Sequence, residues 1–365
     1  MYKEEDLVRL AKRRNNKKRT YLVVNRLQGK HIPVSGNEAF RMFDQLAESL
    51  KTDYEGEKLL LIGFAETATA IGARVAIKLH ALYMQTTREK IKDVDYLYFS
   101  ESHSHATEQK LVKDDLDSYM NTIDRVIFIE DEVTTGNTIL GIVNILRETY
   151  GKKVKFSVAS ILNGMDQEAR KKYAEQGIAL HYLVKTDHSK YPEMVSGYHT
   201  EGTYINGRSS DLLLEYKELE INGYVNARRL VSSDEYENAC ENLWKELEKN
   251  ISDSSGNQLV IGTEEFMYPA LFVAAKMEEM GINAVSHSTT RSPIAVFDEE
   301  NYPIHMANEI GSLYEEERIT YIYDVKKYDK VYVITDAVKT GLEKDLINVL
   351  KKSGNEDITI VRWKE

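Results

Sequence analysis

The chain has 365 residues, and at about 150 residues per domain this length predicts two domains, each large enough to bury a hydrophobic core. The formal net charge of −11 argues against nucleic-acid binding, because a phosphate backbone needs a basic face. A single cysteine, Cys240, excludes an intramolecular disulfide, and no apolar run is long enough to cross a membrane, so we expect a cytoplasmic protein with no membrane partner.

Predicted strands and helices alternate along the first half of the chain. The apolar run YLVV (21–24) predicts a strand, and residues 34–50 carry apolar side chains at helical spacing. A second apolar run, KLLLIGF (58–64), leads into a helical segment (68–81) and a further strand-like run (81–88). Continuous hydrophobicity is typical of strands covered on both faces. We therefore predict an α/β fold with Rossmann-like units, mainly parallel sheets and flanking helices.

The second half of the chain repeats the first half in the same order. Four pairs of similar segments begin at residues 34 and 231, 60 and 259, 85 and 288, and 124 and 329. Such ordered recurrence predicts two copies of one α/β unit. Polar segments between the copies place the predicted boundary between domains 1–215 and 216–365.

The segment VIFIEDEVTTGNT (126–138) carries the clearest chemistry in the first copy. A buried parallel strand that ends in acids and a Thr/Gly turn places these groups at the carboxyl edge of a sheet, where ligands bind. The adjacent carboxylates of Glu130 and Asp131 can accept hydrogen bonds from two neighbouring hydroxyls, as a ribose diol offers. The turn and the helix start supply backbone N–H groups and hydroxyls from Thr134, Thr135, Gly136, Asn137 and Thr138. We expect a sugar-phosphate cradle.

This segment resembles the signature of type I phosphoribosyltransferases, which bind 5-phosphoribosyl-1-pyrophosphate. One position departs from the signature, since Glu132 stands where an apolar residue is usual. The resemblance implies that GFAETATAIG (63–72) is the family's pyrophosphate loop, with contacts from Glu66, Thr67 and Ala68. It also implies that Arg88, in QTTRE, contacts the leaving diphosphate, a role that suits a permanently charged guanidinium.

A polar segment (89–118) separates Arg88 from the acidic pair. Long loops inside compact domains are usually lids or disordered, and in the resembled family a mobile hood occupies this place. His103 and His105 lie in it and are candidate catalytic residues that contact diphosphate or transfer a proton. A metal site at this His-x-His pair, which lacks an identified third ligand, and a simple solvated loop are the alternatives.

The second copy carries a narrower resemblance in HSTTRSPIAVF (287–297). Its Thr-Arg-Ser-Pro string is similar to the TRSP domain that follows a phosphoribosyltransferase domain in bacterial tellurite-resistance-associated gene clusters. This copy has Thr335 where the first has Glu130, so we expect a degenerate copy. Its residues Thr290, Arg291 and Ser292 form either a second anion or substrate pocket or an ordinary strand-end turn. The chain would then be a monomeric pseudo-dimer or a homodimer.

The resemblance implies transfer of phosphoribose from 5-phosphoribosyl-1-pyrophosphate to a nitrogen of an unidentified base-like compound, in the synthesis of a nucleoside-like metabolite. Mg²⁺ is the expected cofactor, bound mainly through the substrate, with Asp131 as a candidate protein ligand. The alternative is a non-catalytic sensor that binds phosphoribosyl pyrophosphate or a nucleotide.

Overall fold

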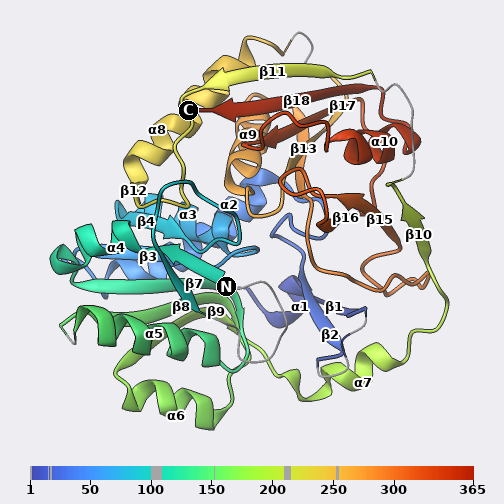
Figure 1. Cartoon of the computed structure of the whole chain (residues 1–365). Helices are drawn as coiled ribbons and strands as arrows, with labels where there is room; N and C mark the ends of the chain where they lie inside the picture. The colour runs from blue at the N-terminus through green and yellow to red at the C-terminus, as the bar shows by residue number, and fades with distance from the viewer. Residues whose placement is uncertain are drawn as a thin grey trace. The chain divides into compact units, whose positions relative to one another are not determined.

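A computed structural model of the chain describes residues 2–14, 16, 19–99, 109–151, 153–208, 215–251 and 255–365 (Figure 1). The chain divides into two compact units. Unit 1 consists mainly of Phe40–Thr186 and Val225–Ala239, and unit 2 of Lys3–Ala39, Asp187–Tyr224 and Cys240–Glu365. This division differs from a single boundary at 215/216, because early and middle segments of the chain carry strands that pair within unit 2.

Unit 1 is built on a sheet with strand order β12-β4-β3-β7-β8-β9, parallel throughout except for β12. The strands are β3 (Leu59–Gly63), β4 (Leu82–Gln85), β7 (Arg125–Val133), β8 (Lys155–Asn163), β9 (Ile178–Lys185) and β12 (Val231–Ser232). The helices are α2 (Gly36–Lys51), α3 (Thr69–Leu79), α5 (Asn137–Tyr150) and α6 (Gln167–Glu175). Figure 1 shows α5 and α6 beside β8 and β9. The chain enters unit 1 within α2.

The two central strands of unit 1 form its core. Leu60–Ile62 in β3 and Val126–Ile129 in β7 have no exposed surface, and α3 lies against both strands. Because alternate residues of a strand face opposite sides of a sheet, these continuous apolar runs must be covered on both faces. The predicted α/β fold with mainly parallel sheets is confirmed.

A hairpin and a short helix lie in the polar segment between Arg88 and the acidic pair, where the sequence resemblance implies a hood. They are β5 (Tyr96–Phe99), β6 (Gln109–Val112) and α4 (Lys113–Tyr119), followed by the 3₁₀ turn η1 (Met120–Thr122). The hairpin is ordered because Phe99 is buried with its ring centroid 5.9 Å from that of Phe64. The described residues of segment 89–118 therefore include a strand pair and a short helix.

Unit 2 contains a five-stranded parallel sheet with strand order β11-β18-β17-β13-β14. The strands are β11 (Lys217–Asn222), β13 (Asn257–Gly262), β14 (Asn283–Ser288), β17 (Lys330–Thr335) and β18 (Asp357–Lys364). Two smaller sheets comprise β1 (Val8–Lys12) with β2 (Tyr21–Asn25), and β10 (Thr203–Asn206) with β15 (Met306–Gly311) and β16 (Ile319–Tyr323). The helices are α1 (Glu4–Leu7), α7 (Tyr191–Ser196), α8 (Ser233–Glu248), α9 (Tyr268–Glu279) and α10 (Lys344–Lys352), with a 3₁₀ turn η2 (His188–Lys190).

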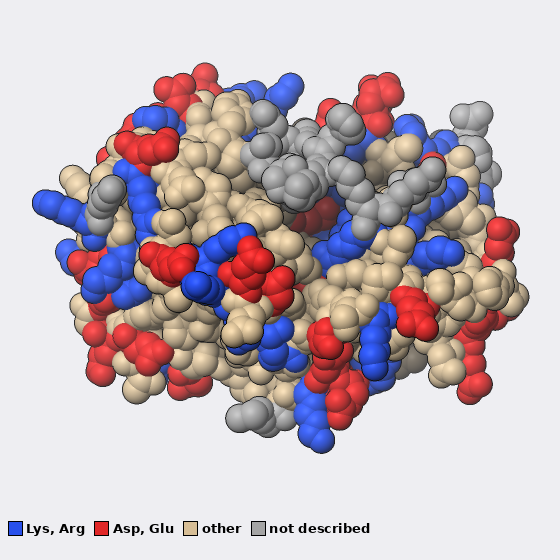
Figure 2. All heavy atoms as spheres, turned by 90° about the horizontal axis from the view of Figure 1, so that it is seen from below, with Lys and Arg blue, Asp and Glu red and all other residues tan. Residues whose placement is uncertain are grey.

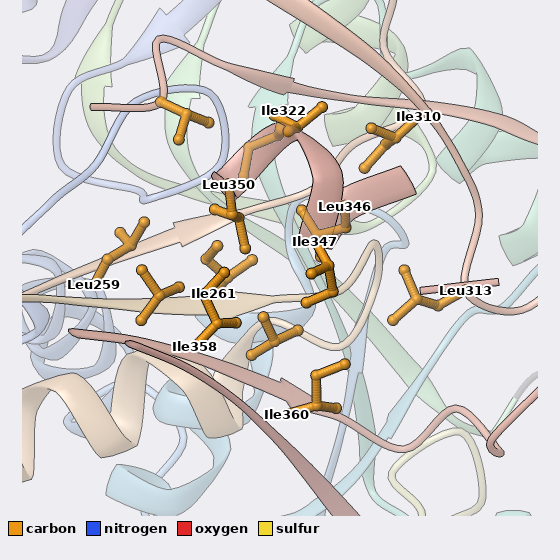
Figure 3. Packing of buried hydrophobic residues seen from close by; sticks show 14 of the residues in the cluster. Leu259, Ile261, Ile310, Leu313, Ile322, Leu346, Ile347, Leu350, Ile358 and Ile360 are labelled. Carbon is orange, nitrogen blue, oxygen red and sulfur yellow. The ribbon is translucent and has the colours of Figure 1, made fainter. Parts of the chain in front are cut away.

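The core of unit 2 joins its sheet to α10 (Figure 3). Leu259 and Ile261 of β13 and Ile360 of β18 have no exposed surface, and they pack with Ile347 and Leu350 of α10. Leu259 and Ile261 are two apart in β13, as Ile358 and Ile360 are in β18, and Ile347 and Leu350 are three apart in α10, so one sheet face meets one helix face. The helix that follows β17 is thereby fixed against the sheet.

The two units share one topology. The order β4-β3-β7-β8 in unit 1 matches β14-β13-β17-β18 in unit 2, and α3 and α9 occupy corresponding positions in sequence. An antiparallel pair follows each second strand, β5 with β6 in unit 1 and β15 with β16 in unit 2. The predicted duplication is confirmed.

Charges are mixed on the surface. Figure 2 shows Lys and Arg side chains interspersed with Asp and Glu on the face in view. Within the described ranges, none of the helices is both long and apolar enough to span a membrane.

Candidate functional site

β7 carries the predicted acidic pair at the carboxyl edge of the unit 1 sheet. Glu130 and Asp131 are half-buried and follow the fully buried Ile129. β3 ends at Gly63, opposite Ile129, so both acids lie beyond the end of that neighbouring strand. β7 continues beside β8 to Val133, so the strand includes the acids and does not stop at them as predicted. The carboxylates therefore stand at the side of the sheet where the loop after β3 begins.

The Thr/Gly turn connects β7 directly to α5, which begins at Asn137. Gly136 has a φ of 70°, and a Cβ atom there would lie 2.3 Å from the hydroxyl oxygen of Tyr173, so only glycine fits. The Tyr173 hydroxyl donates a hydrogen bond to the Gly136 carbonyl oxygen at 2.6 Å. Burial raises the pKa of Tyr173, and the charge of Glu130 raises it further, so the phenol keeps its proton. Nothing in the sequence motif indicated Tyr173.

The predicted phosphate-loop residues form this turn and the first residues of α5. Thr134 and Thr138 are half-buried, and Thr135 and Asn137 are exposed. They lie at the amino end of α5, where the helix dipole favours an anion. The structure brings the turn and the acidic pair to the same edge of β7.

The predicted pyrophosphate loop starts beside the acids. The Phe64 N–H donates to the carbonyl oxygen of Ile129 at 3.1 Å, directly before the acidic pair. Glu66 is buried and Thr67 is half-buried. The Ala68 N–H donates to the Phe64 carbonyl oxygen at 3.0 Å, so in this structure it closes the turn.

Thr86 fixes the middle of this loop. Its hydroxyl accepts a hydrogen bond from the Ala65 N–H at 2.8 Å and donates to the Gln109 side-chain oxygen at 2.6 Å. All three residues are buried. Thr86 thus links the loop after β3, the loop after β4 and the hairpin strand β6. Its neighbour Arg88 was the residue chosen from the sequence, whereas Thr86 was missed.

Arg88 is half-buried in the loop after β4. The preceding residue, Thr87, exchanges two backbone hydrogen bonds with Lys110 of β6, at 2.9 and 3.1 Å. Lys110 is buried, with its ammonium 4.4 Å from the centroid of the Tyr96 ring. Arg88 therefore directly follows the residue that pairs with the hairpin strand β6. The other two candidate catalytic residues, His103 and His105, lie outside the described residues.

Models of two known protein families match this chain, and one of them covers the carboxyl edge of the unit 1 sheet. A family model described as "Phosphoribosyl transferase" matches residues 7–188, which include the acidic pair, both loops and Arg88. The chain belongs to this phosphoribosyltransferase family. A second model, described as "TRSP domain C terminus to PRTase_2", matches residues 229–350. The predicted phosphoribosyltransferase with a C-terminal TRSP domain is confirmed.

Solved structures of phosphoribosyltransferases match the chain at low identity. Adenine phosphoribosyltransferase from Rhodothermus marinus is 16% identical over 50% of this chain and 96% of its own, with a TM-score of 0.36. The enzyme from Giardia lamblia, complexed with 9-deazaadenine, is 17% identical with the same coverage and a TM-score of 0.37. Hypoxanthine phosphoribosyltransferase from Staphylococcus aureus is 16% identical over 42% of this chain and 75% of its own, with a TM-score of 0.27. Among curated proteins, none matches the sequence.

The TRSP part of the phosphoribosyltransferase contains Thr290, Arg291 and Ser292, for which the sequence left open a second pocket or a strand-end turn. Thr290 exchanges backbone hydrogen bonds with Tyr321 at 2.8 and 2.7 Å, as Thr87 does with its hairpin in unit 1. The Ser292 N–H donates to the Thr290 hydroxyl at 3.1 Å. The Arg291 guanidinium lies 2.5 Å from a carboxylate oxygen of Glu264. Arg291 is therefore bonded to a side chain of its own unit.

A cavity of about 710 Å³ in unit 2 lies away from these loops. It is lined by Asn257 and Asn283, the first residues of β13 and β14, and by Tyr328 shortly before β17. These positions are at the amino edge of the parallel sheet. The loops that follow β13 and β14, which contain Glu264 and Arg291, lie at its carboxyl edge. We assign the cavity no role in phosphoribosyl transfer.

Proposed function

We propose that unit 1 of this phosphoribosyltransferase binds 5-phosphoribosyl-1-pyrophosphate with Mg²⁺ and transfers its phosphoribosyl group to a nitrogen of a base-like compound, releasing pyrophosphate. The observation that carries the proposal is the meeting of three features at one sheet edge: the acidic pair, the turn before α5 and the loop after β3. Each matches one part of the donor: the ribose diol, the 5′-phosphate and the diphosphate.

The acidic pair suits the ribose. Two ionised carboxylates accept hydrogen bonds and donate none, so Glu130 and Asp131 select a ligand with adjacent hydroxyls. Their half-buried position strengthens these bonds relative to water while leaving them accessible.

The two loops suit the phosphates. The turn at Thr134–Thr138 presents N–H groups and hydroxyls to the 5′-phosphate, and the dipole of α5 adds favourable charge. Arg88 and the loop containing Glu66 and Thr67 take the diphosphate, the leaving group.

The reaction exchanges one bond at the anomeric carbon. The C1–O bond to diphosphate breaks with its electron pair leaving on oxygen, a C1–N bond forms, and the nitrogen loses its proton. Charge develops on the diphosphate while the ribose becomes oxocarbenium-like, so positioned cationic and N–H groups accelerate the step. In our proposal Arg88 supplies that charge, and the hairpin that carries Lys110 excludes water.

The carboxylate oxygens of the acidic pair are ligands that Mg²⁺ prefers, and Asp131 is the candidate to hold it. When bound, the ion would neutralise charge on the diphosphate. We also propose a nucleoside-like product, made in the cytoplasm. The TRSP domain, which the sequence resemblance links to tellurite-resistance-associated gene clusters, supports the proposed class of product.

Pyrophosphate release tests the proposal. The full chain is incubated with phosphoribosyl pyrophosphate, Mg²⁺ and a panel of purine, pyrimidine and other nitrogen bases. We expect release with at least one base, and a loss of about 10-fold or more in Glu130→Gln, since one charged hydrogen bond to the diol is weakened. Glu148→Gln, an exposed acid of α5, is the matched control and should retain activity. Equal turnover by Glu130→Gln and wild type would contradict the proposed role of the acidic pair.

A further inference from the structure

The loop after β3 in unit 1 and the loop after β13 in unit 2 share one anchoring hydrogen bond. In unit 1 the Ala65 N–H donates to the Thr86 hydroxyl at 2.8 Å, and in unit 2 the Glu264 N–H donates to the Thr289 hydroxyl at 2.9 Å. Glu264 therefore occupies the position of Ala65, in the loop where unit 1 would receive the diphosphate. Its φ of 52° makes it one of the few non-glycine residues described with a left-handed backbone.

The Glu264 side chain reaches the cations of unit 2. Only 1% of it is exposed, and one carboxylate oxygen lies 2.5 Å from Arg291 Nε and 3.0 Å from Arg318 Nη1. The other oxygen accepts a hydrogen bond from the buried Ser312 hydroxyl. The Lys30 ammonium, also buried, donates to the Glu264 carbonyl oxygen at 2.7 Å. Arg291 is the counterpart of Arg88, so the carboxylate stands where a diphosphate oxygen would meet that arginine.

The position of the ribose diol is also filled. Asp336, the counterpart of Asp131, accepts hydrogen bonds on both carboxylate oxygens, from Tyr314 at 2.7 Å and from Tyr224 at 2.9 Å. Two phenol hydroxyls thus stand in the relation to this acid that two ribose hydroxyls would have.

The position of the 5′-phosphate holds a third internal group. Glu343 aligns with Thr138 and directly precedes α10, where unit 1 has its phosphate turn. Its carboxylate, 3% exposed, lies 3.2 Å from the Arg362 guanidinium and accepts a hydrogen bond from the Tyr216 hydroxyl at 2.9 Å. A buried carboxylate at this helix start takes the place of an anion.

We propose that Glu264 is an internal surrogate for diphosphate, and that unit 2 is a latent anion site closed by its own side chains. The ligand class assigned to the closed site rests on the function proposed for unit 1. A buried carboxylate between two guanidinium groups can replace a phosphate there. Both anions offer several oxygen atoms that accept hydrogen bonds from arginine. Deleting the Glu264 side chain removes the buried carboxylate that Arg291 and Arg318 share and creates room for an added anion. The intact chain then binds one phosphoribosyl pyrophosphate, not two.

Chemical rescue tests the proposal with sodium pyrophosphate, and with sodium phosphate and acetate at matched ionic strength. In the full chain, Glu264→Ala should lower Tm by about 5–10 °C, as expected for breaking a buried ion cluster. Pyrophosphate should then raise the Tm of this variant by at least about 4 °C more than it raises that of wild type. Any response of unit 1 is present in both proteins, so the difference reports unit 2. Calorimetric titration should show one additional pyrophosphate per chain in the variant.

Three further proteins make the result specific. Glu315→Gln removes the exposed carboxylate bonded to the same Arg318 and should respond as wild type does. Glu264→Ala combined with Arg291→Gln should lose the extra response. Glu264→Gly also leaves room for the anion, suits the left-handed backbone at this position, and serves if the alanine variant does not fold. The proposal is overturned if no Glu264 variant responds more than wild type, if the extra response survives loss of Arg291, or if wild type binds two phosphoribosyl pyrophosphates. Failure of wild type to bind any would instead count against the proposed function of unit 1.

Discussion

Tyr173 lies outside the signature segment but fixes the conformation of its Thr/Gly turn. Its hydroxyl donates to the carbonyl oxygen of Gly136, and its ring fills the space that a side chain at 136 would need. Because the phenol is buried and stays protonated, this contact holds the phosphate turn in one conformation.

Tyr173→Phe should therefore weaken donor binding without unfolding unit 1. Loss of one buried hydrogen bond costs about 1 kcal/mol, and the Gly136 carbonyl still accepts from the Leu140 N–H, so we expect KM for phosphoribosyl pyrophosphate to rise about fivefold. Tyr150→Phe, which loses a bond to the exposed Asp117 at the far end of α5, is the matched control. Equal KM values for the two variants would contradict the role given to Tyr173.

His287 makes the stability of unit 2 depend on pH. It is buried in β14 with Nε2 2.9 Å from the Tyr323 carbonyl oxygen, and burial lowers its pKa to about 4. The unfolded chain has the ordinary value near 6.5, so between pH 6.5 and 4 the unfolded state binds the proton. Stability should fall as pH drops through this window, by of order 3 kcal/mol from this group.

Urea unfolding at pH 7 and pH 4.5 measures this effect. The difference in unfolding free energy between the two pH values should shrink in His287→Gln relative to wild type. The exposed His199, changed in the same way, should leave the difference unchanged. An undiminished difference in His287→Gln would show that other groups control the acid sensitivity.

At the scale of elements, two glycines in helices differ in how closely they are packed. In α3 a Cβ on Gly72 would lie 2.9 Å from Tyr83 Cε2 and 3.0 Å from the Cα atom of Gly63, so α3 packs directly against the start of the pyrophosphate loop. In α5 a Cβ on Gly141 would meet no atom within 4 Å.

Alanine at these two sites should change stability in opposite directions. Gly72→Ala overpacks the contact and should destabilise by about 1–3 kcal/mol, with weaker pyrophosphate binding because the loop shifts. Gly141→Ala should stabilise by about 0.5–1 kcal/mol, since alanine is the better helix former. Denaturant unfolding of both variants provides the measurement. Destabilisation by both would mean that helix packing around α5 is tighter than the structure shows.

The elements also show what could be predicted from the sequence. Continuous apolar runs at β3 and β7 predicted buried parallel strands, because only strands covered on both faces need such runs. The hairpin β5–β6 was not predicted, since its strands are short and the order comes from long-range packing such as that of Phe99 on Phe64. Glu264 could not be recognised either: it is one charge among many until the fold brings Arg291 and Arg318 to it.

At the scale of the whole molecule, two copies of one topology have different side chains at the positions that correspond to the proposed donor site. Unit 1 keeps its acidic pair and a turn ending in glycine before α5, whereas unit 2 fills the corresponding positions with Glu264, paired tyrosines and Glu343. The duplication was readable from sequence because the apolar strands recur in order. The division of the chain into units was not, because pairing between distant strands determines it.

Calorimetric titration of phosphoribosyl pyrophosphate with Mg²⁺ tests the central claim most directly. It compares wild type with a Glu130→Gln, Asp131→Asn double variant whose folding is verified by circular dichroism. We predict one site per chain in wild type and a loss of at least about 100-fold in affinity in the variant, because both diol acceptors lose their charge. Equal binding by the two proteins, or no binding by folded wild type, would contradict the assignment of the donor to the acidic edge of β7.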